Sequence, residues 1–463
     1  MLHFVALIGY LVGMSLVASY YSKFIKTEED FLLAGRRLGA VVLAGTMMAT
    51  WMGSGTVVGG TNSLGYQYGP WVAVIFGIAS PIGILLLVFL SKRIKAMQAR
   101  SVPDVFELAY GPAARAIVSV IVMIAYLAIT SYQFTGTGFV LNAILGIPTS
   151  VATLISAVAI TAMTVTGGLV SVAYTDFISA VLMLTGLLLG VPAAIIRAGG
   201  WSSIAAKLPP QNLRLGGITW LKILGYFLPT FLLVIGDQNM YQRLFAAKDA
   251  THARMGSIGW FIGVALVMPL VAFGATASRA LHPNIPAGQA LITLAVKDMP
   301  AVLGMLCIIA ISAFIVTTGD SFLLTCSTNL GWDLYFRYIN PKASERQRLV
   351  FYRAAVIVLA AIAYVIVQFF PTVLAVQMYA YTMYGAAVTP PLLAAVIWPG
   401  TTKAAGISSM LVGAVTTLTW EIMKKPFGID TVLVAAPLSV AVLVIVNLLT
   451  RGKKVPSQVS KAV

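Results

Sequence analysis

Long apolar stretches separated by short polar connections follow one another along almost the whole chain. Many of them exceed 18 residues, the length that an α-helix needs to cross about 30 Å of hydrocarbon. Charged residues, proline or glycine bound each stretch. The pattern predicts thirteen membrane-spanning segments, at about 3–22, 39–65, 69–91, 114–145, 149–166, 169–196, 217–242, 254–278, 300–335, 349–370, 372–398, 404–423 and 431–450.

Composition strengthens this prediction. The chain has 463 residues, of which 59% are hydrophobic and only 10% are charged, and its mean hydropathy is +0.93. A water-soluble domain could not cover its surface with so few charges. We therefore expect one all-α domain over residues 1–463 that lies in the lipid bilayer of the cell membrane.

The net charge of +16 would suit a nucleic-acid-binding protein, but the distribution of the charges does not. Basic residues lie in the connections, and most of them follow the odd-numbered segments. Because cytoplasmic connections carry the excess of Lys and Arg, we expect the N-terminus outside and the C-terminus in the cytoplasm. The basic residues expected on the outer face are Arg197, Lys207, Arg214, Lys222, Arg279, Lys297, Lys424 and Lys425.

Segment 39–65 contains the sequence ATWMGSGTVVGG, in which glycines and small hydroxyls interrupt an apolar run. The spacing of Gly53, Gly55 and Gly59 resembles a dinucleotide-binding loop, but that loop follows a strand, and no single strand spans lipid. Close helix packing accounts for Gly55 and Gly59. It accounts less well for the hydroxyls, whereas a helix unwound at half depth frees carbonyls for a cation or a polar substrate. We therefore predict a broken helix near residues 50–55.

Segment 217–242 carries a second interruption. Pro229 removes a helix hydrogen bond, and Gly236 and Asp237 follow it, so we expect a break near residues 231–236. Two discontinuous helices five segments apart indicate a transporter built from inverted repeats, and we expect them to face each other. The predicted division is an extra N-terminal helix and loop at 1–38, a five-helix repeat at 39–197, a second repeat at 217–398, and two extra C-terminal helices with a short tail at 404–463.

Segment 300–335 carries polar residues on one helical face. Thr317, Asp320 and Ser321 have the spacing i, i+3, i+4, and Thr325 and Thr328 continue the face. Hydroxyls in membrane helices often bond to their own backbone, and that explanation stays open for the last two. A carboxylate as deep as that of Asp320 needs a cation, a proton or a basic partner. Carbonyl, hydroxyl and carboxylate oxygens together suit a hard cation such as sodium.

Four motifs resemble the sodium:solute symporter family, whose members carry sugars, proline, pantothenate, choline or sialic acid with sodium. They are DFLLAGRRLG before the first broken helix, TVTGGLVSVAYTDFISAV between the fifth and sixth segments, GDQNMYQRLFAAKDATHAR at the end of the seventh, and TTGDSFLLTCSTNLGWDLY at the end of the ninth. The resemblance covers nearly the whole chain. It implies a leucine-transporter-like fold and alternating access driven by sodium.

The resemblance also implies ion ligands. The main sodium site of the family uses two carbonyls of the first broken helix, and a carbonyl and two adjacent hydroxyls of the eighth core helix. The carbonyl donor on that helix is usually Ala, so Phe314 departs from the pattern. Some members have a further site that uses the Asp of the TD motif; for Asp176 the alternative is an acid at a helix start. The matching residues are Ala49, Met52, Phe314, Thr317 and Thr318 for the main site, and Asp176, Thr317, Asp320 and Ser321 for the second.

Substrate-binding residues are expected beside the helix breaks. Trp51 stands where the proline carriers have Asp and the sugar carriers Asn, which weakens any transfer of substrate identity. An indole there suits a methylated ammonium or stacks on another ring. No Lys, Arg or His lies at the expected half depth, so we expect a zwitterionic or neutral metabolite, such as an amino acid or a choline-like compound. The candidates are Trp51, Ser54, Ser131, Gln133, Phe231, Gln377 and Tyr381.

The sequence does not indicate an enzyme, because its three histidines lack metal-binding spacing and no GxSxG motif is present. The predicted function is sodium-driven symport of a small organic solute into the cell, with sodium as the one implied cofactor. Nothing in the sequence indicates a nucleic acid or an obligate protein partner. The alternative is a proton-coupled carrier of the same fold, with Asp176 and Asp320 as a proton relay.

Overall fold

The computed structural model describes residues 2–166, 168–215, 218–398 and 400–450, and this part of the chain contains helices and connections but no β-strand. Eleven helices of these described residues are long and apolar enough to span a membrane, and one bent pair makes a twelfth. The predicted segment 149–166 is a shorter apolar helix. The predicted count of thirteen is reached only if that helix also spans the membrane, so it is not confirmed.

The helices of the first half carry both the first break and the TD motif. They are α1 (Leu2–Ser22), α2 (Glu28–Leu33), α3 (Ala40–Trp51), the π-helix η2 (Gly55–Gly59), α4 (Gly60–Tyr68), α5 (Pro70–Ala96), α6 (Val102–Tyr110), α7 (Pro112–Leu145), α8 (Thr149–Thr166) and α9 (Leu169–Arg197).

The second half contains the other long helices and several short ones. They are α10 (Gly200–Ala206), α11 (Trp220–Gly236), α12 (Gln238–Ala246), α13 (Ala250–Leu281), α14 (Ala290–Lys297), α15 (Ala301–Thr328), the π-helix η6 (Asn329–Ile339), α16 (Glu345–Ile366), η7 (Val367–Phe369), α17 (Val373–Ala387), α18 (Thr389–Ile397), α19 (Lys403–Ile422) and α20 (Val432–Thr450).

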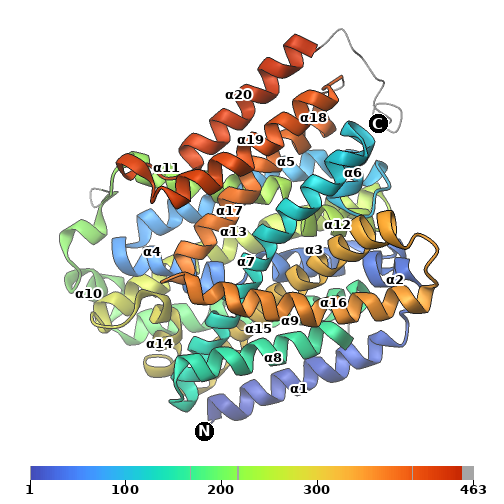
Figure 1. Cartoon of the computed structure of the whole chain (residues 1–463). Helices are drawn as coiled ribbons and strands as arrows, with labels where there is room; N and C mark the ends of the chain where they lie inside the picture. The colour runs from blue at the N-terminus through green and yellow to red at the C-terminus, as the bar shows by residue number, and fades with distance from the viewer. Residues whose placement is uncertain (1, 167, 216–217, 399, 451–463) are drawn as a thin grey trace.

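Helices that are distant in the sequence pack together around the middle of the molecule. α13 lies against α5 and α3, and α15 lies against α9 and α7. α1 and α8 form one edge of the molecule, whereas α19 and α20 form the opposite edge (Figure 1). One large hydrophobic cluster fills the interior. Apolar side chains such as Val5, Leu16 and Leu449 are exposed on the edges, as expected where a helix faces lipid tails.

The first predicted break is confirmed. α3 ends at Trp51, and Met52 leaves the helical conformation, with φ −95° and ψ 95°. The helix resumes when the N–H groups of Thr56 and Val57 donate to the carbonyl of Gly53. The two halves are bent by 55° relative to each other. The chain is therefore unwound where glycines and small hydroxyls interrupt the apolar run.

The second break lies at Asp237, one residue beyond the predicted window of 231–236. Pro229 lies inside α11 and does not end it, and α11 and α12 together form one membrane span. The window was wrong because distant side chains hold the backbone open. The Tyr384 hydroxyl donates to the Gly236 carbonyl (2.7 Å), and the N–H of Gln238 donates to the Tyr126 hydroxyl (2.7 Å). Backbone groups freed inside lipid must be satisfied in this way.

Candidate ion and substrate site

Two hydroxyls of α15 converge on the end of α3. The hydroxyls of Thr317 and Thr318 lie 3.0 Å and 3.2 Å from the carbonyl oxygen of Ala49. The Thr317 hydroxyl also lies 2.7 Å from the carbonyl of Ala313 and 3.5 Å from that of Phe314. Four of the five residues predicted for the main sodium site, Phe314 included, therefore form one buried cluster of oxygen atoms. This donor set fits a hard cation.

Met52, the fifth predicted ligand, lies in the break itself. In the described residues its carbonyl makes no hydrogen bond to the two threonine hydroxyls. At the next residue, Gly53, the backbone of the break lies very close to neighbouring side chains. A Cβ atom on Gly53 would lie 2.6 Å from the Thr318 hydroxyl and 2.8 Å from the side-chain oxygen of Gln133. Only glycine permits this approach.

The TD-motif carboxylate lies deep in the same region. Asp176 is fully buried, and one of its oxygens accepts hydrogen bonds from Thr46 (2.6 Å) and Thr50 (3.1 Å) of α3. The Thr50 hydroxyl also lies 3.0 Å from that of Ser321 on α15. Because α9 begins at Leu169, Asp176 lies two turns inside the helix. The alternative of an acid at a helix start is therefore wrong.

A buried arginine completes this cluster, and sequence reasoning missed it. Arg243 forms an ion pair with Asp176 (3.3 Å) and donates to the hydroxyls of Ser321 (2.8 Å) and Thr46 (2.9 Å). Segment 217–242 was expected to end before Arg243, which would place this residue in the next, cytoplasmic connection. That boundary is wrong, because α12 continues to Ala246 and buries the side chain. The signal available in the sequence was the need of Asp176 for a partner.

The cluster retains an excess of negative charge. Asp320 is buried one turn along α15 from Thr317, and it forms no ion pair in the described residues. Among the described residues, one carboxylate oxygen of Asp176 and one of Asp320 lie buried without a hydrogen-bond partner. One guanidinium therefore stands against two buried carboxylates, and it pairs with only one of them. Since an unpaired buried charge is costly, the arrangement suits an additional cation or proton.

Two glutamines satisfy the backbone of the first break. The side-chain oxygen of Gln133 accepts from the N–H of Ser54, and that of Gln377 accepts from the N–H of Gly60, both at 2.8 Å. This arrangement uses the side-chain oxygen of Gln133 as an acceptor and leaves its amide N–H groups unused. The amide nitrogen of Gln133 and the hydroxyl of Ser54 are both buried and have no partner in the part of the chain that the structure describes. They are the groups available to a polar ligand beside the break.

Aromatic rings line the same side of the break. Trp51 stacks on Tyr381, with ring centroids 6.3 Å apart, and meets Trp260 edge to face at 6.2 Å. The hydroxyl of Tyr132 reaches that of Tyr381 at 3.5 Å. The structure therefore brings Trp51 and Tyr381 together with the two glutamines and the serine. Such rings can hold the apolar part or the cationic end of a solute.

Two of the predicted substrate residues are not part of this group. The hydroxyl of Ser131 donates to the carbonyl of Ala128 in its own helix (2.8 Å). Phe231 lies before the second break and stacks on Phe227, with centroids 5.9 Å apart. The prediction of Phe231 depended on the wrong window for the second break. Both residues are consistent with packing alone.

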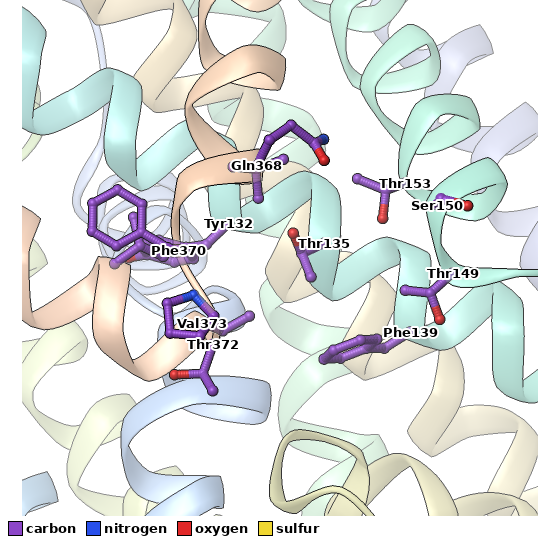
Figure 2. A pocket seen from close by; sticks show the side chains of 13 residues that line it. Tyr132, Thr135, Phe139, Thr149, Ser150, Thr153, Gln368, Phe370, Thr372 and Val373 are labelled. Carbon is purple, nitrogen blue, oxygen red and sulfur yellow. The ribbon is translucent and has the colours of Figure 1, made fainter.

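A pocket of about 160 Å³ opens between α7, α8 and the turn that leads from η7 into α17. Figure 2 shows hydroxyls of Thr135, Thr149 and Thr153 around it. Tyr132 lines this pocket and also contacts Tyr381 at the break. Val373 and Val376 of α17 line it as well; Val373 lies one turn before Gln377 and Val376 directly before it. The pocket thus lies next to the candidate substrate residues.

The model of the sodium:solute symporter family matches residues 31–413 of the chain. Among curated proteins, the osmoregulated proline transporter OpuE of Bacillus subtilis is 25% identical, over 96% of this chain and 94% of that protein. The sodium/proline symporter of Escherichia coli is 27% identical, over 90% and 87%. The human high affinity choline transporter 1 is 25% identical, over 83% and 70%.

Solved structures agree on the fold. A Na⁺-coupled sialic acid symporter, described as substrate-bound and outward-open with a novel Na⁺ site, superposes with a TM-score of 0.83. Its sequence is 18% identical, and the match covers 99% of this chain and 98% of that one. The nucleobase-cation-symport-1 family transporter Mhp1 superposes with a TM-score of 0.61 at 12% identity, covering 94% and 98%.

Proposed function

The chain belongs to the sodium:solute symporter family, and on that premise we propose that it imports a small zwitterionic or neutral organic solute together with sodium, by alternating access. It is a multi-pass membrane transporter and not an enzyme. The observation that carries the proposal is the convergence of the Thr317 and Thr318 hydroxyls on the Ala49 carbonyl at a helix break.

Sodium would be held where α3 ends and α15 passes. The carbonyls of Ala49 and Phe314 and the hydroxyls of Thr317 and Thr318 supply oxygen ligands without a formal charge. Met52 would supply a fifth oxygen once its carbonyl turns toward this cluster. The ion contributes the positive charge that holds the broken end of α3 against α15. The dipole at the C-terminal end of α3 also favours a cation there.

A second cation, sodium or a proton, would lie between Asp176, Asp320 and Ser321. The support is the two buried carboxylate oxygens without a partner beside a single guanidinium. The proton-coupled carrier remains the second candidate function, since the same oxygens also accept a proton. The two candidates differ in the ion gradient that drives uptake.

The solute would bind on the other side of the same break. The buried donors of Gln133 and Ser54 suit a carboxylate or another acceptor, and the rings of Trp51 and Tyr381 suit an ammonium or an apolar ring. Curated relatives named as carriers of proline and of choline agree with a solute of this size. We propose an amino acid or a betaine-like compound, with Gln377 holding the break in shape.

Coupling follows from the shared break. Sodium at Ala49 and solute at Ser54 both require one conformation of the four residues between them, so each favours the binding of the other by linkage. Release of sodium would free the end of α3 and weaken the solute site. The division into repeats at 39–197 and 217–398, with the N-terminus outside, is part of the same proposal.

The test is uptake by the purified protein in proteoliposomes. Labelled proline, choline and glycine betaine are offered with an inward sodium gradient, and then with potassium and a proton gradient in its place. We expect uptake of one of these solute classes that needs sodium and saturates with it. Choline salts are avoided as the sodium substitute because choline is itself a candidate. Uptake driven equally well by protons alone would replace the proposal by the proton-coupled carrier.

A further inference from the structure

A groove of about 610 Å³ runs along the edge of the molecule formed by α1 and α8, with α16 beside them. Figure 1 shows this edge, opposite α19 and α20. Small and apolar side chains of α1 and α8 form its walls, and one cation closes it. The lining residues are Leu11, Ser15, Ala18, Ser19, Ser22, Ala159, Ala162, Met163, Val165 and Arg353.

The groove opens on a surface that faces the membrane. Apolar side chains next to it are exposed on all three helices, including Leu16 of α1 (67%), Val158 of α8 (63%) and Ile357 of α16 (55%). A surface of this kind is stable only against lipid. An occupant of the groove therefore comes from the bilayer or from another membrane protein.

Arg353 has no partner within the described protein. Its guanidinium forms no hydrogen bond, ion pair or ring contact there, whereas Arg348 on the same helix pairs with Glu28 at 3.1 Å. Arg353 lies eight residues after Glu345, the start of α16, which is about 12 Å along the helix axis. A cation at that depth beside lipid tails is costly unless it reaches an anion. The groove places it where a lipid headgroup is within reach.

Hydroxyls of α1 line the groove together with the arginine of α16. Ser15, Ser19 and Ser22 have the spacing i, i+4, i+7 and lie on one face of α1. Ser15 and Ser22 donate to carbonyls of their own helix, while Ser19 donates to none in the described residues. Ser19 therefore has a proton to offer an oxygen in the groove, as Arg353 does.

The polar end of the groove is basic. Ser22 is followed by the exposed Lys23 and Lys26, and the N–H of Glu28 donates to Glu345 at the start of α16 (2.8 Å). This contact joins the start of α2, six residues after α1 ends, to the start of α16, and the two lysines lie in the short connection between α1 and α2. Basic pockets between membrane helices near the cytoplasmic surface bind anionic lipid headgroups.

We propose that this groove binds one anionic glycerophospholipid of the inner leaflet. Its phosphate would accept hydrogen bonds from Arg353 and Ser19, and Lys23 would attract it. Its acyl chains would lie along Leu11, Met163 and Val165. The bound lipid would join α1, which lies outside the predicted repeats, to α8 and α16. This proposal does not depend on the identity of the transported solute.

The test uses the full chain in detergent, titrated with phosphatidylglycerol or with phosphatidylcholine of the same acyl chains. Bound lipid is counted by native mass spectrometry, and the thermal unfolding temperature is followed in parallel. We expect phosphatidylglycerol to bind and stabilise the wild type more than phosphatidylcholine does. Arg353→Gln should weaken that preference about fivefold, the effect of one basic residue near an anionic headgroup.

Two further variants make the test specific. Arg346→Gln removes the same charge from an exposed position of α16 outside the groove and should keep the preference. Arg353→Lys keeps the charge and should retain most of it. An unchanged preference in Arg353→Gln would overturn the proposal. Equal stabilisation by inorganic phosphate would overturn it as well, because it would indicate a soluble anion. Dimers that form in the wild type and are lost in Arg353→Gln would also overturn it, because they would indicate that a second copy of the chain occupies the groove.

Discussion

Two adjacent hydroxyls of α15 lie against a carbonyl that α3 leaves without a helical partner. In the described residues no backbone N–H donates to the Ala49 oxygen, because the N–H of Met52 bonds to Met48 and the helix ends there. Thr317 and Thr318 fill that place without ions. When a cation enters, it can use the same oxygens, since a hydroxyl has lone pairs as well as a proton.

Thr317→Val and Thr318→Val keep the shape of the side chain and remove one oxygen each. We expect the sodium concentration for half-maximal uptake to rise at least about fivefold in either variant, because a lost polar contact in a dry site costs about 1–3 kcal/mol. Apparent solute affinity should fall with it by linkage. The control is Thr185→Val, whose exposed hydroxyl bonds only to its own helix. Unaltered sodium dependence in both variants would mean that the main site lies elsewhere.

Replacing Asp176 should mainly affect stability, whereas replacing Asp320 should mainly affect ion coupling. Asp176→Asn leaves the buried Arg243 without its ion-pair partner, so we expect a loss of stability of about 3–5 kcal/mol, measured as a lower unfolding temperature. Asp320→Asn breaks no ion pair, and should instead alter the number of coupled ions or the pH dependence of uptake. If Asp320→Asn transports like the wild type between about pH 5.5 and 8.5, that carboxylate is structural and the second ion site is wrong.

At the scale of elements, the broken helix depends on glycine at one position. Gly53→Ala would place a Cβ atom 2.6 Å from the Thr318 hydroxyl, and relieving such overpacking costs about 1–3 kcal/mol. We expect the break to move away from α15, which raises the sodium requirement about tenfold and lowers uptake. Gly13→Ala on α1 is the control, because a Cβ there meets nothing within 4 Å. Equal uptake by the two variants would contradict a site built on this close approach.

Sequence patterns predicted the position of a helix break correctly where the residues that cause the break lie in the same helix. The glycines and hydroxyls near Gly53 are local, and the first break lies where they predicted it. The second break was misplaced because its causes are distant: Tyr126 and Tyr384 reach it from α7 and α17. Pro229 was the more visible local signal, but α11 continues through it.

In the candidate site, too, contacts between residues distant in the sequence were not predicted. The spacing of Thr317, Asp320 and Ser321 predicted a polar face that lies in the core. Arg243 was missed because hydropathy alone assigns an arginine at the end of an apolar segment to the adjoining loop. Its burial depends on Asp176, 67 residues away in sequence. A pair of this kind becomes visible only when α9 and α12 are placed side by side.

At the scale of the whole molecule, an ion-pair network joins η6, which follows α15, to α6 and the start of α7. Arg115 of α7 pairs with Asp104, Glu107 and Asp333, and Arg337 pairs with Glu107 as well. Burial raises the pKa of Glu107, but the hydrogen bonds from the two arginines outweigh it, so its pKa lies below the ordinary value. The folded state therefore binds its proton less readily than the unfolded state does.

This difference fixes the sign of a pH effect. Glu107 should stabilise the fold above its unfolded pKa of about 4.3, and that contribution should disappear as the pH falls through the lower folded value. The variant Glu107→Gln should then unfold at a lower temperature than the wild type near pH 7, with the gap closing in acid. The measurement is thermal unfolding in detergent across that range. A gap that widens as the pH falls would show that Glu107 is not held in its charged form.

The orientation of the molecule is a prediction from its charges, because the connections expected inside carry most of the Lys and Arg. Ser202 in α10 and Lys342 between η6 and α16 are both exposed, and they belong to opposite predicted faces. The native cysteines, Cys307 and Cys326, are buried and should not react. We expect a membrane-impermeant maleimide applied to whole cells to label Ser202→Cys and to spare Lys342→Cys until the membrane is opened. The reverse pattern would place the N-terminus inside, and the groove at Arg353 would then lie toward the outer leaflet.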